Sequence, residues 1–247
     1  FQMCRQMEQR ICCSADLLFA ISEKLIESRS VWREDIQHLP VGAETERFLA
    51  KKEAERVPEM LSKTARKIVG YYGSIDDRLD TALCLTLAKR LENTSFFFFG
   101  PIRQSASLDE LRSLSNVHFP GPIAYEDLPS FAGAFDLCIL PYKKTRFNEY
   151  IFPNKIFEYL ATGNPVVCTD VPSLRYLERD GLIRIGRSED GFAAAVEELL
   201  QVPEKGREAR LQCAAENTWS TRAKKMEASI EDFLLEKGFS LSPTPLS

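Results

Sequence analysis

Lys155 and Glu158 are the two side chains of this 247-residue sequence whose types and spacing point most directly to chemistry. They follow Pro153 and Asn154 at the predicted start of a helix, and a separation of three residues places both on one helical face. Backbone amides at a helix N-terminus attract anions, a lysine adds positive charge, and a carboxylate accepts hydrogen bonds from hydroxyl groups. The group therefore suits a ligand that carries both phosphate and hydroxyl groups.

The apolar pattern around this group predicts the elements that position it. Phe157, Leu160 and Ala161 continue the helix on one side. Gly163 ends the helix, and residues 165–169 have the composition of a short buried strand. The lysine and the glutamate therefore belong to a helix that leads directly into a sheet.

Strands and helices alternate regularly from residue 67 onward. We expect an α/β fold with a Rossmann-like parallel sheet that has helices on both faces. Ligands of such sheets bind at the carboxyl ends of the strands, and Gly73, Gly100, Gly121, Pro141 and the loop before Pro153 fall there. The predicted strands are 68–73, 95–100, 116–119, 136–141, 165–169 and 182–185, and the predicted helices besides the one near Pro153 are 77–91, 108–114, 125–134, 173–179, 191–200, 204–217 and 220–236.

The first 66 residues lack the regular alternation of strands and helices predicted for the rest of the chain. Residues 3–15 and 23–29 are predicted to be helical, and residues 16–21 and 36–39 to be strands. Residues 44–63 are rich in charge and only weakly periodic, which is typical of an interdomain linker with some helix. Because the chain starts at Phe1 within a helical pattern, we interpret it as a fragment of a longer protein.

Composition narrows the classes of function. Hydrophobic residues make up 44% and charged residues 28%, as in globular proteins, and the formal charge of −4 argues against a nucleic-acid-binding surface. Seven cysteines, mostly in apolar settings, indicate reduced thiols and a cytoplasmic protein. The cysteines and the two histidines lack a zinc-type spacing, so a structural zinc site is not expected. The sequence contains no run of 18 apolar residues, so no membrane-spanning helix is predicted.

The segment from Phe152 to Val167 resembles the nucleotide-sugar signature of retaining GT-B glycosyltransferases of the family-four type (glycosyl transferases group 1). Other segments are similar to motifs of the same family along almost the whole chain. They are residues 16–22, 38–43 with Phe48, 70–75 with Asp80, 98–101, 117–121, 125–129, 135–142 and 217–219. The resemblance implies the C-terminal half of a GT-B fold with a remnant of the N-terminal domain.

The resemblance also implies how the chain is divided. Residues 1–43 would end a truncated N-terminal acceptor domain, and residues 44–66 would form a linker. Residues 67–217 would bind the nucleotide sugar, residues 218–239 would form a helix that crosses back, and residues 240–247 would be a flexible tail. Peripheral membrane association through the missing N-terminal part is compatible with this division.

The function implied is transfer of a sugar from a nucleoside-diphosphate sugar to an unidentified acceptor, which would be a glycan, a lipid-linked molecule or a small molecule. The family likeness implies retention at the sugar carbon and no metal ion or other cofactor. Lys155 and Glu158 are the expected catalytic residues, the lysine at the diphosphate and the glutamate at the ribose. The expected donor-binding residues are Gly73, Ser74, Gly100, Arg103, Phe119, Tyr125, Arg146, Pro153, Asn154, Lys155 and Glu158.

Two departures from the family pattern leave alternatives open. The turn after the first strand, Gly73 to Arg78, is acidic before it is basic, and Tyr150 stands where many relatives carry a first glutamate. One alternative is a nucleotide-sugar epimerase or a phosphorylase on the same architecture. Another is a non-catalytic, transferase-like partner domain. Release of a nucleoside diphosphate from a donor would separate a transferase from the non-catalytic domain.

Overall fold

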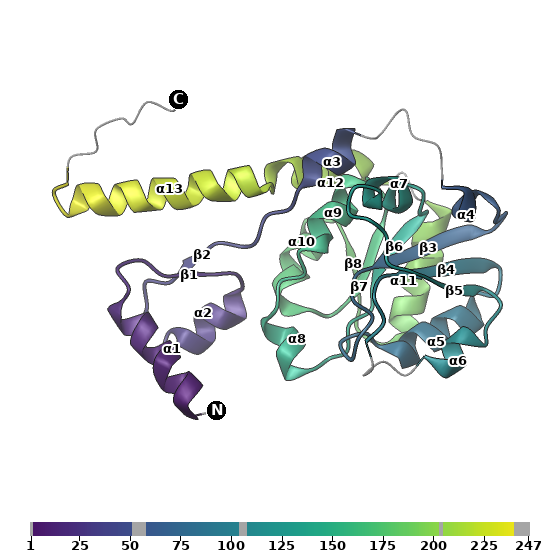
Figure 1. The fold of residues 1–247 in the computed structure, drawn as a ribbon, viewed down its shortest axis with the longest axis horizontal. Coiled ribbons are helices and arrows are strands. Elements are labelled where there is room, and N and C mark those ends of the chain that lie inside the picture. Colours follow the sequence, from purple (N-terminus) through teal and green to yellow (C-terminus); the bar gives the residue numbers. More distant parts are fainter. Residues whose placement is uncertain (1, 51–57, 104–107, 203–204, 240–247) are drawn as a thin grey trace.

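A six-stranded parallel sheet forms the centre of the molecule (Figure 1). The structure is a computed structural model that describes residues 2–50, 58–103, 108–202 and 205–239. The strand order is β5-β4-β3-β6-β7-β8, as expected for a Rossmann-like fold, so the predicted fold class is confirmed. The strands are β3 (Lys67–Tyr72), β4 (Thr94–Phe99), β5 (Val117–Gly121), β6 (Leu137–Leu140), β7 (Val166–Thr169) and β8 (Arg184–Gly186).

The central strands form because their sequences are apolar on both faces. All residues of β4 and of β6 are buried, and in β3 only Lys67 at the strand start is exposed. A strand covered on both sides needs such a continuous apolar run rather than an alternating one. Parallel pairing in register then aligns the carboxyl ends of β3, β4 and β6 at one edge of the sheet.

Helices cover the sheet in two groups (Figure 1). One group consists of α5 (Thr81–Arg90), α6 (Asp109–Arg112) and α11 (Glu189–Gln201). The other consists of α3 (Thr45–Ala50), α7 (Leu128–Gly133), α9 (Lys155–Ala161) and α12 (Arg207–Glu216). In the second group α9 carries the signature residues, and α3 and α12 both pack against it. The signature helix is therefore held between the sheet and other helices.

One predicted helix begins later than expected. The prediction of a helix from residue 77 is wrong at its start, because α5 begins at Thr81 after the Asp80 side chain caps the Leu83 amide at 3.0 Å. The preceding segment instead pairs with neighbouring loops through the bridges Ile75–Ile102 and Leu79–Tyr142. These two bridges fold the turn after β3 over the edge of the sheet.

Several other predicted boundaries also differ from the observed ones. The predicted strand 16–21 is reduced to β1 (Phe19–Ala20), which pairs with β2 (Gln37–His38), and the predicted helix 125–134 begins at Leu128. The predicted helix 173–179 is divided into a 3-10 turn, η1 (Pro172–Leu174), and α10 (Arg175–Arg179). One short helix was not predicted at all, α8 (Arg146–Tyr150), where Thr145 caps the Asn148 amide at 3.2 Å.

The N-terminal residues form a small unit that faces the sheet domain. It contains α1 (Gln2–Ser14), α2 (Glu23–Arg29) and the β1–β2 pair. The Ser22 hydroxyl, which is fully buried, donates to the Tyr150 carbonyl at 2.9 Å and so ties this unit to the end of α8. At the other end of the chain α13 (Trp219–Glu236) runs outward from the end of α12 (Figure 1).

The segment predicted as a linker with some helix contains two short helices among its described residues. Within residues 44–66 lie α3 and α4 (Glu59–Ser62), and Phe48 of α3 is buried against the main core. Residues 51–57 of this segment and the predicted tail, 240–247, lie outside the described residues. In the described part of the chain, no helix is long and apolar enough to cross a membrane.

Candidate functional site

A glycine turn at the end of β3 forms the floor of the candidate site. Gly73 has a φ of +131°, which favours glycine, and its amide donates to the Phe99 carbonyl at 2.9 Å. A Cβ at position 73 would lie 2.1 Å from Lys155 Nζ, and a Cβ at Gly100 would lie 2.0 Å from the Gly73 carbonyl oxygen. The absence of side chains at both glycines therefore lets two turns and the lysine meet at one point.

Lys155 begins α9 and places its ammonium group over this turn. Its Nζ donates to the Tyr71 hydroxyl at 3.3 Å and lies 4.5 Å from the centre of the Tyr71 ring. Burial, and then the nearby positive charge of Arg78, lower the pKa of Lys155 to about 7. Among the described residues no carboxylate lies within ion-pair distance of Nζ. Lys155 is therefore a partly buried amino group that has no carboxylate partner within the described part of the chain.

Arg78 adds a second cation that the sequence prediction missed. Its guanidinium makes a bidentate pair with Asp76 at 2.7 and 2.9 Å, and this pair raises the pKa of the arginine. Arg78 and Lys155 line the same cavity. The acidic residues ahead of Arg78 made the turn look unsuited to anions, but the fold uses one of them to orient the arginine. The signal that could have revealed Arg78 is its position in the turn directly after Gly73.

Glu158 lies one helical turn beyond Lys155 and is held by two tyrosines. Its Oε2 accepts a hydrogen bond from the Tyr72 hydroxyl at 2.8 Å, and its Oε1 accepts one from the Tyr125 hydroxyl at 3.2 Å. Burial raises the pKa of Glu158, whereas the two hydroxyls and Lys155 act in the opposite direction. Tyr72 is buried, but the side chain of Tyr125 is 39% exposed. One oxygen of the carboxylate is thus bound by a buried partner and the other by a partly exposed one.

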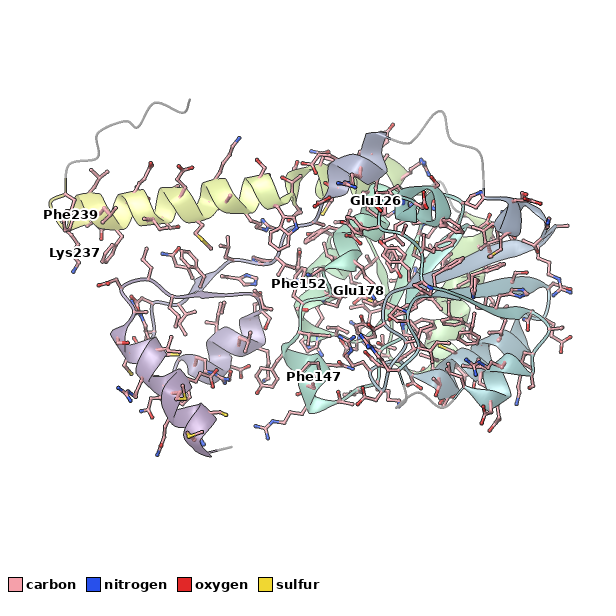
Figure 2. The ribbon with its side chains drawn as sticks, viewed as in Figure 1. Glu126, Phe147, Phe152, Glu178, Lys237 and Phe239 are labelled. Carbon is pink, nitrogen blue, oxygen red and sulfur yellow. The ribbon has the colours of Figure 1, made fainter. Side chains whose placement is uncertain are left out.

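A cavity of about 1150 Å³ opens beside Lys155, between the sheet domain and the N-terminal unit. Four of the predicted residues, Arg146, Pro153, Asn154 and Lys155, line it together. Figure 2 labels Phe147 and Phe152 on the sheet-domain side of this region. The other lining residues are Cys4, Arg5, Glu8, Ile21, Leu25, Ser28, Arg29, Trp32, Arg78, Tyr142, Tyr150 and Ile151.

Three predicted donor-binding residues have different surroundings. The Ser74 carbonyl accepts a hydrogen bond from the Tyr71 hydroxyl at 2.9 Å, so Ser74 lies at the turn but contributes its backbone. Arg103 is exposed and does not line the cavity beside Lys155. Phe119 stacks on Phe98 with ring centres 5.3 Å apart and lines a separate hollow at the β5 edge. The structure therefore does not bring Arg103 or Phe119 to Lys155.

The family model described as glycosyl transferases group 1 matches residues 66–202. A Bacillus subtilis protein, TuaH, whose name assigns it to teichuronic acid biosynthesis as a glycosyltransferase, is 31% identical over 201 residues. That match covers 79% of this chain and 49% of the relative, so the chain spans about half the length of the curated protein it matches.

Solved structures share the fold at low sequence identity. Sucrose-phosphate synthase from Thermosynechococcus elongatus is 18% identical with a TM-score of 0.75, and the match covers 96% of this chain and 63% of that one. HepE from Anabaena, solved in complex with UDP and glucose, is 16% identical with a TM-score of 0.68, covering 92% and 67%. The family match spans more than half of the sequence and includes β3 through α11. The chain therefore belongs to the glycosyl transferases group 1 family.

Proposed function

We propose that this chain binds a nucleoside-diphosphate sugar and that the protein transfers the sugar to an acceptor without a metal ion. The observation that carries the proposal is Lys155, a partly buried cation over the Gly73 turn with no carboxylate in ion-pair distance among the described residues. Removing a cation from water costs free energy, and an anionic ligand would offset that cost. Membership of the glycosyl transferases group 1 family supports the assignment to sugar transfer.

The proposed reaction needs positive charge at the leaving group. The bond between the sugar C1 and the diphosphate oxygen breaks, and its electron pair stays on the diphosphate. The acceptor hydroxyl forms the new bond to C1, and its proton passes to the departing diphosphate. Lys155 and Arg78 would stabilise the growing negative charge, the role for which fixed charges in a partly dry site are effective. We propose retention at C1 from the family likeness and assign no side chain as a base.

Glu158 is proposed to bind the ribose of the donor. A carboxylate accepts hydrogen bonds from two adjacent hydroxyl groups, and both Glu158 oxygens already accept from tyrosine hydroxyls. Tyr125 is the more exposed of the two tyrosines, so a ribose hydroxyl would replace it on Oε1 while Tyr72 stays on Oε2. Free thiols at all seven cysteines are typical of a reducing compartment, and we place the reaction in the cytoplasm.

Calorimetric titration with UDP, GDP and ADP tests the proposal. At least one of these should bind, and Lys155→Ala and Glu158→Ala should each weaken it by about 1–3 kcal/mol, the range for removing a partner of a charged hydrogen bond. Lys225→Ala and Glu227→Ala on the exposed surface of α13 are the matched controls and should leave the affinity unchanged. Equal affinity in the unaltered chain and in both site variants would refute the assignment.

A further inference from the structure

The cavity beside Lys155 carries far more positive charge than the chain as a whole. Five cationic side chains and one carboxylate line it within the described residues, although the formal charge of the sequence is −4. Two of the cations, Lys155 and Arg78, lie at the Gly73 turn and are assigned above to the diphosphate. The other three come from different elements, Arg5 from α1, Arg29 from α2 and Arg146 from α8. A donor diphosphate does not account for them.

Arg5 and Arg29 both lie against one indole ring. The guanidinium carbons of Arg5 and Arg29 are 5.9 and 5.5 Å from the centre of the Trp32 ring. Arg29 Nε donates a hydrogen bond of 2.6 Å to Glu8 Oε1, so these two side chains form a pair. Arg5 has no carboxylate partner in the described part of the chain. The N-terminal unit therefore presents an aromatic face with a net positive charge to the cavity.

Arg146 lies on the other wall, at the start of α8. It also lacks a carboxylate partner among the residues that the structure describes. Beside it Phe147 is 64% exposed, and Figure 2 shows this ring projecting from α8 toward the α2 side. The Ser22–Tyr150 hydrogen bond holds α8 to the N-terminal unit, so the two walls are tied together. Positive charge and aromatic surface thus occur on both sides of the part of the cavity lined by Arg5, Arg29, Trp32, Arg146 and Phe147, which is called the outer part below.

We propose that the outer part of this cavity binds an acceptor that carries a negative charge, a carboxylate or a phosphate, on a sugar body. The inference rests on the proposed function, because it assigns this part to the acceptor. Two arginines without carboxylate partners among the described residues favour an anion, and arginine pairs with carboxylate and phosphate through two parallel hydrogen bonds. Aromatic rings such as Trp32 and Phe147 offer flat apolar surface for a sugar ring. A cavity of about 1150 Å³ exceeds the usual upper size of about 1,000 Å³ for one small ligand and leaves space for two.

The test compares probes that differ in charge. Methyl β-glucoside, methyl β-glucuronide and glucose 6-phosphate are titrated by NMR into the unaltered chain, with and without UDP. We expect at least one anionic probe to bind fivefold or more tightly than the neutral glucoside, and the two anionic probes distinguish a carboxylate site from a phosphate site. The preference should shrink at 0.5 M salt, because exposed charges are then screened.

Two double variants test whether the cavity causes the preference for the anionic probes. The double variant Arg5→Gln, Arg146→Gln should reduce the preference for the anionic probe to less than twofold. The control Arg10→Gln, Arg179→Gln removes two exposed arginines that do not line the cavity and should keep the preference. Equal binding of neutral and anionic probes, or a preference that survives in the double variant, would overturn the inference. If no nucleoside diphosphate binds, the proposed function fails, while the probe comparison on the ligand-free chain still decides the charge preference.

Discussion

Lys155 is expected to couple ligand binding to the uptake of a proton. Burial and the charge of Arg78 lower the pKa of its ammonium group to about 7. An anionic diphosphate would favour the charged form and raise this pKa in the complex. The free protein then has to take up a proton whenever it binds the ligand above neutral pH.

We therefore predict that donor affinity falls as the pH rises. Above about pH 7 the lysine of the free protein loses its proton, whereas the bound lysine keeps it, so the affinity should weaken by up to about tenfold for each pH unit until the pKa of the complex is reached. The measurement is a calorimetric titration with a nucleoside-diphosphate sugar, whose diphosphate does not titrate in this range, at pH 6.5, 7.5 and 8.5.

Lys155→Arg provides the control for this prediction. Arginine stays charged at every pH used, so this variant should show a flat pH profile, even if its longer side chain lowers the affinity overall. A flat profile in the unaltered chain would show that the lysine is not the titrating group.

At the residue scale the sequence predicted the lysine and the glutamate but not their partners. The three-residue spacing of Lys155 and Glu158 is a local property of one helix. The helical periodicity was therefore sufficient to predict that both side chains lie on one face. Tyr72 reaches Glu158 from 86 positions away and Tyr125 from 33 positions away. Such contacts depend on the order of strands in the sheet, which the spacing of residues along one chain does not encode.

At the scale of elements, buried strands were predicted most reliably. The run Ser95–Phe99 is apolar enough to form a strand in any arrangement of the sheet, and β4 matches it closely. The short helix α8 was missed because one turn of five residues has no measurable periodicity. Its position depends on Thr145 as its cap and on the hydrogen bond from Ser22, a residue 128 positions away from Tyr150.

Ser22 provides a prediction about how elements are held together. Its hydroxyl accepts from the Leu25 amide at 3.3 Å as the cap of α2 and donates to the Tyr150 carbonyl at 2.9 Å. Ser22→Ala should lower the free energy of unfolding by about 1 kcal/mol through the lost cap. It should also speed hydrogen exchange in both α2 and α8, measured by mass spectrometry, because the contact between the two elements is lost.

Ser188→Ala is the matched control for this change. Ser188 caps α11 by accepting from the Gly191 amide at 3.0 Å, and within the described residues its side chain makes no hydrogen bond to another element. Ser188→Ala should lower the free energy of unfolding by a similar amount but leave hydrogen exchange in α2 and α8 unchanged. If Ser22→Ala leaves exchange in α8 unaffected, the hydroxyl does not tie the N-terminal unit to the sheet domain.

At the scale of the whole molecule, two distant segments meet where the N-terminal unit joins the sheet domain. The Ala43 amide donates to the Asn217 carbonyl at 3.1 Å, and Ala43 and Thr218 form an isolated bridge. Arg222, a buried residue of α13, donates to the side chain of Asn217. The sequence predicted a boundary near residue 43 and a helix near residue 220, but composition alone does not show that these two places touch.

Gly42 lies at the tightest point of this junction and provides the last prediction. A Cβ at position 42 would lie 2.7 Å from the Trp219 amide nitrogen and 2.8 Å from the Thr218 carbonyl oxygen. Both are backbone atoms, which move only if the whole junction moves, so Gly42→Ala should cost about 1–3 kcal/mol of unfolding free energy, as overpacking does. Gly133→Ala at the exposed end of α7 places no atom of the described residues within 4 Å of the new Cβ and should be neutral or stabilising by up to about 1 kcal/mol. Urea denaturation of both variants measures the difference, and an equal effect of the two changes would mean that the segments do not pack closely at this junction.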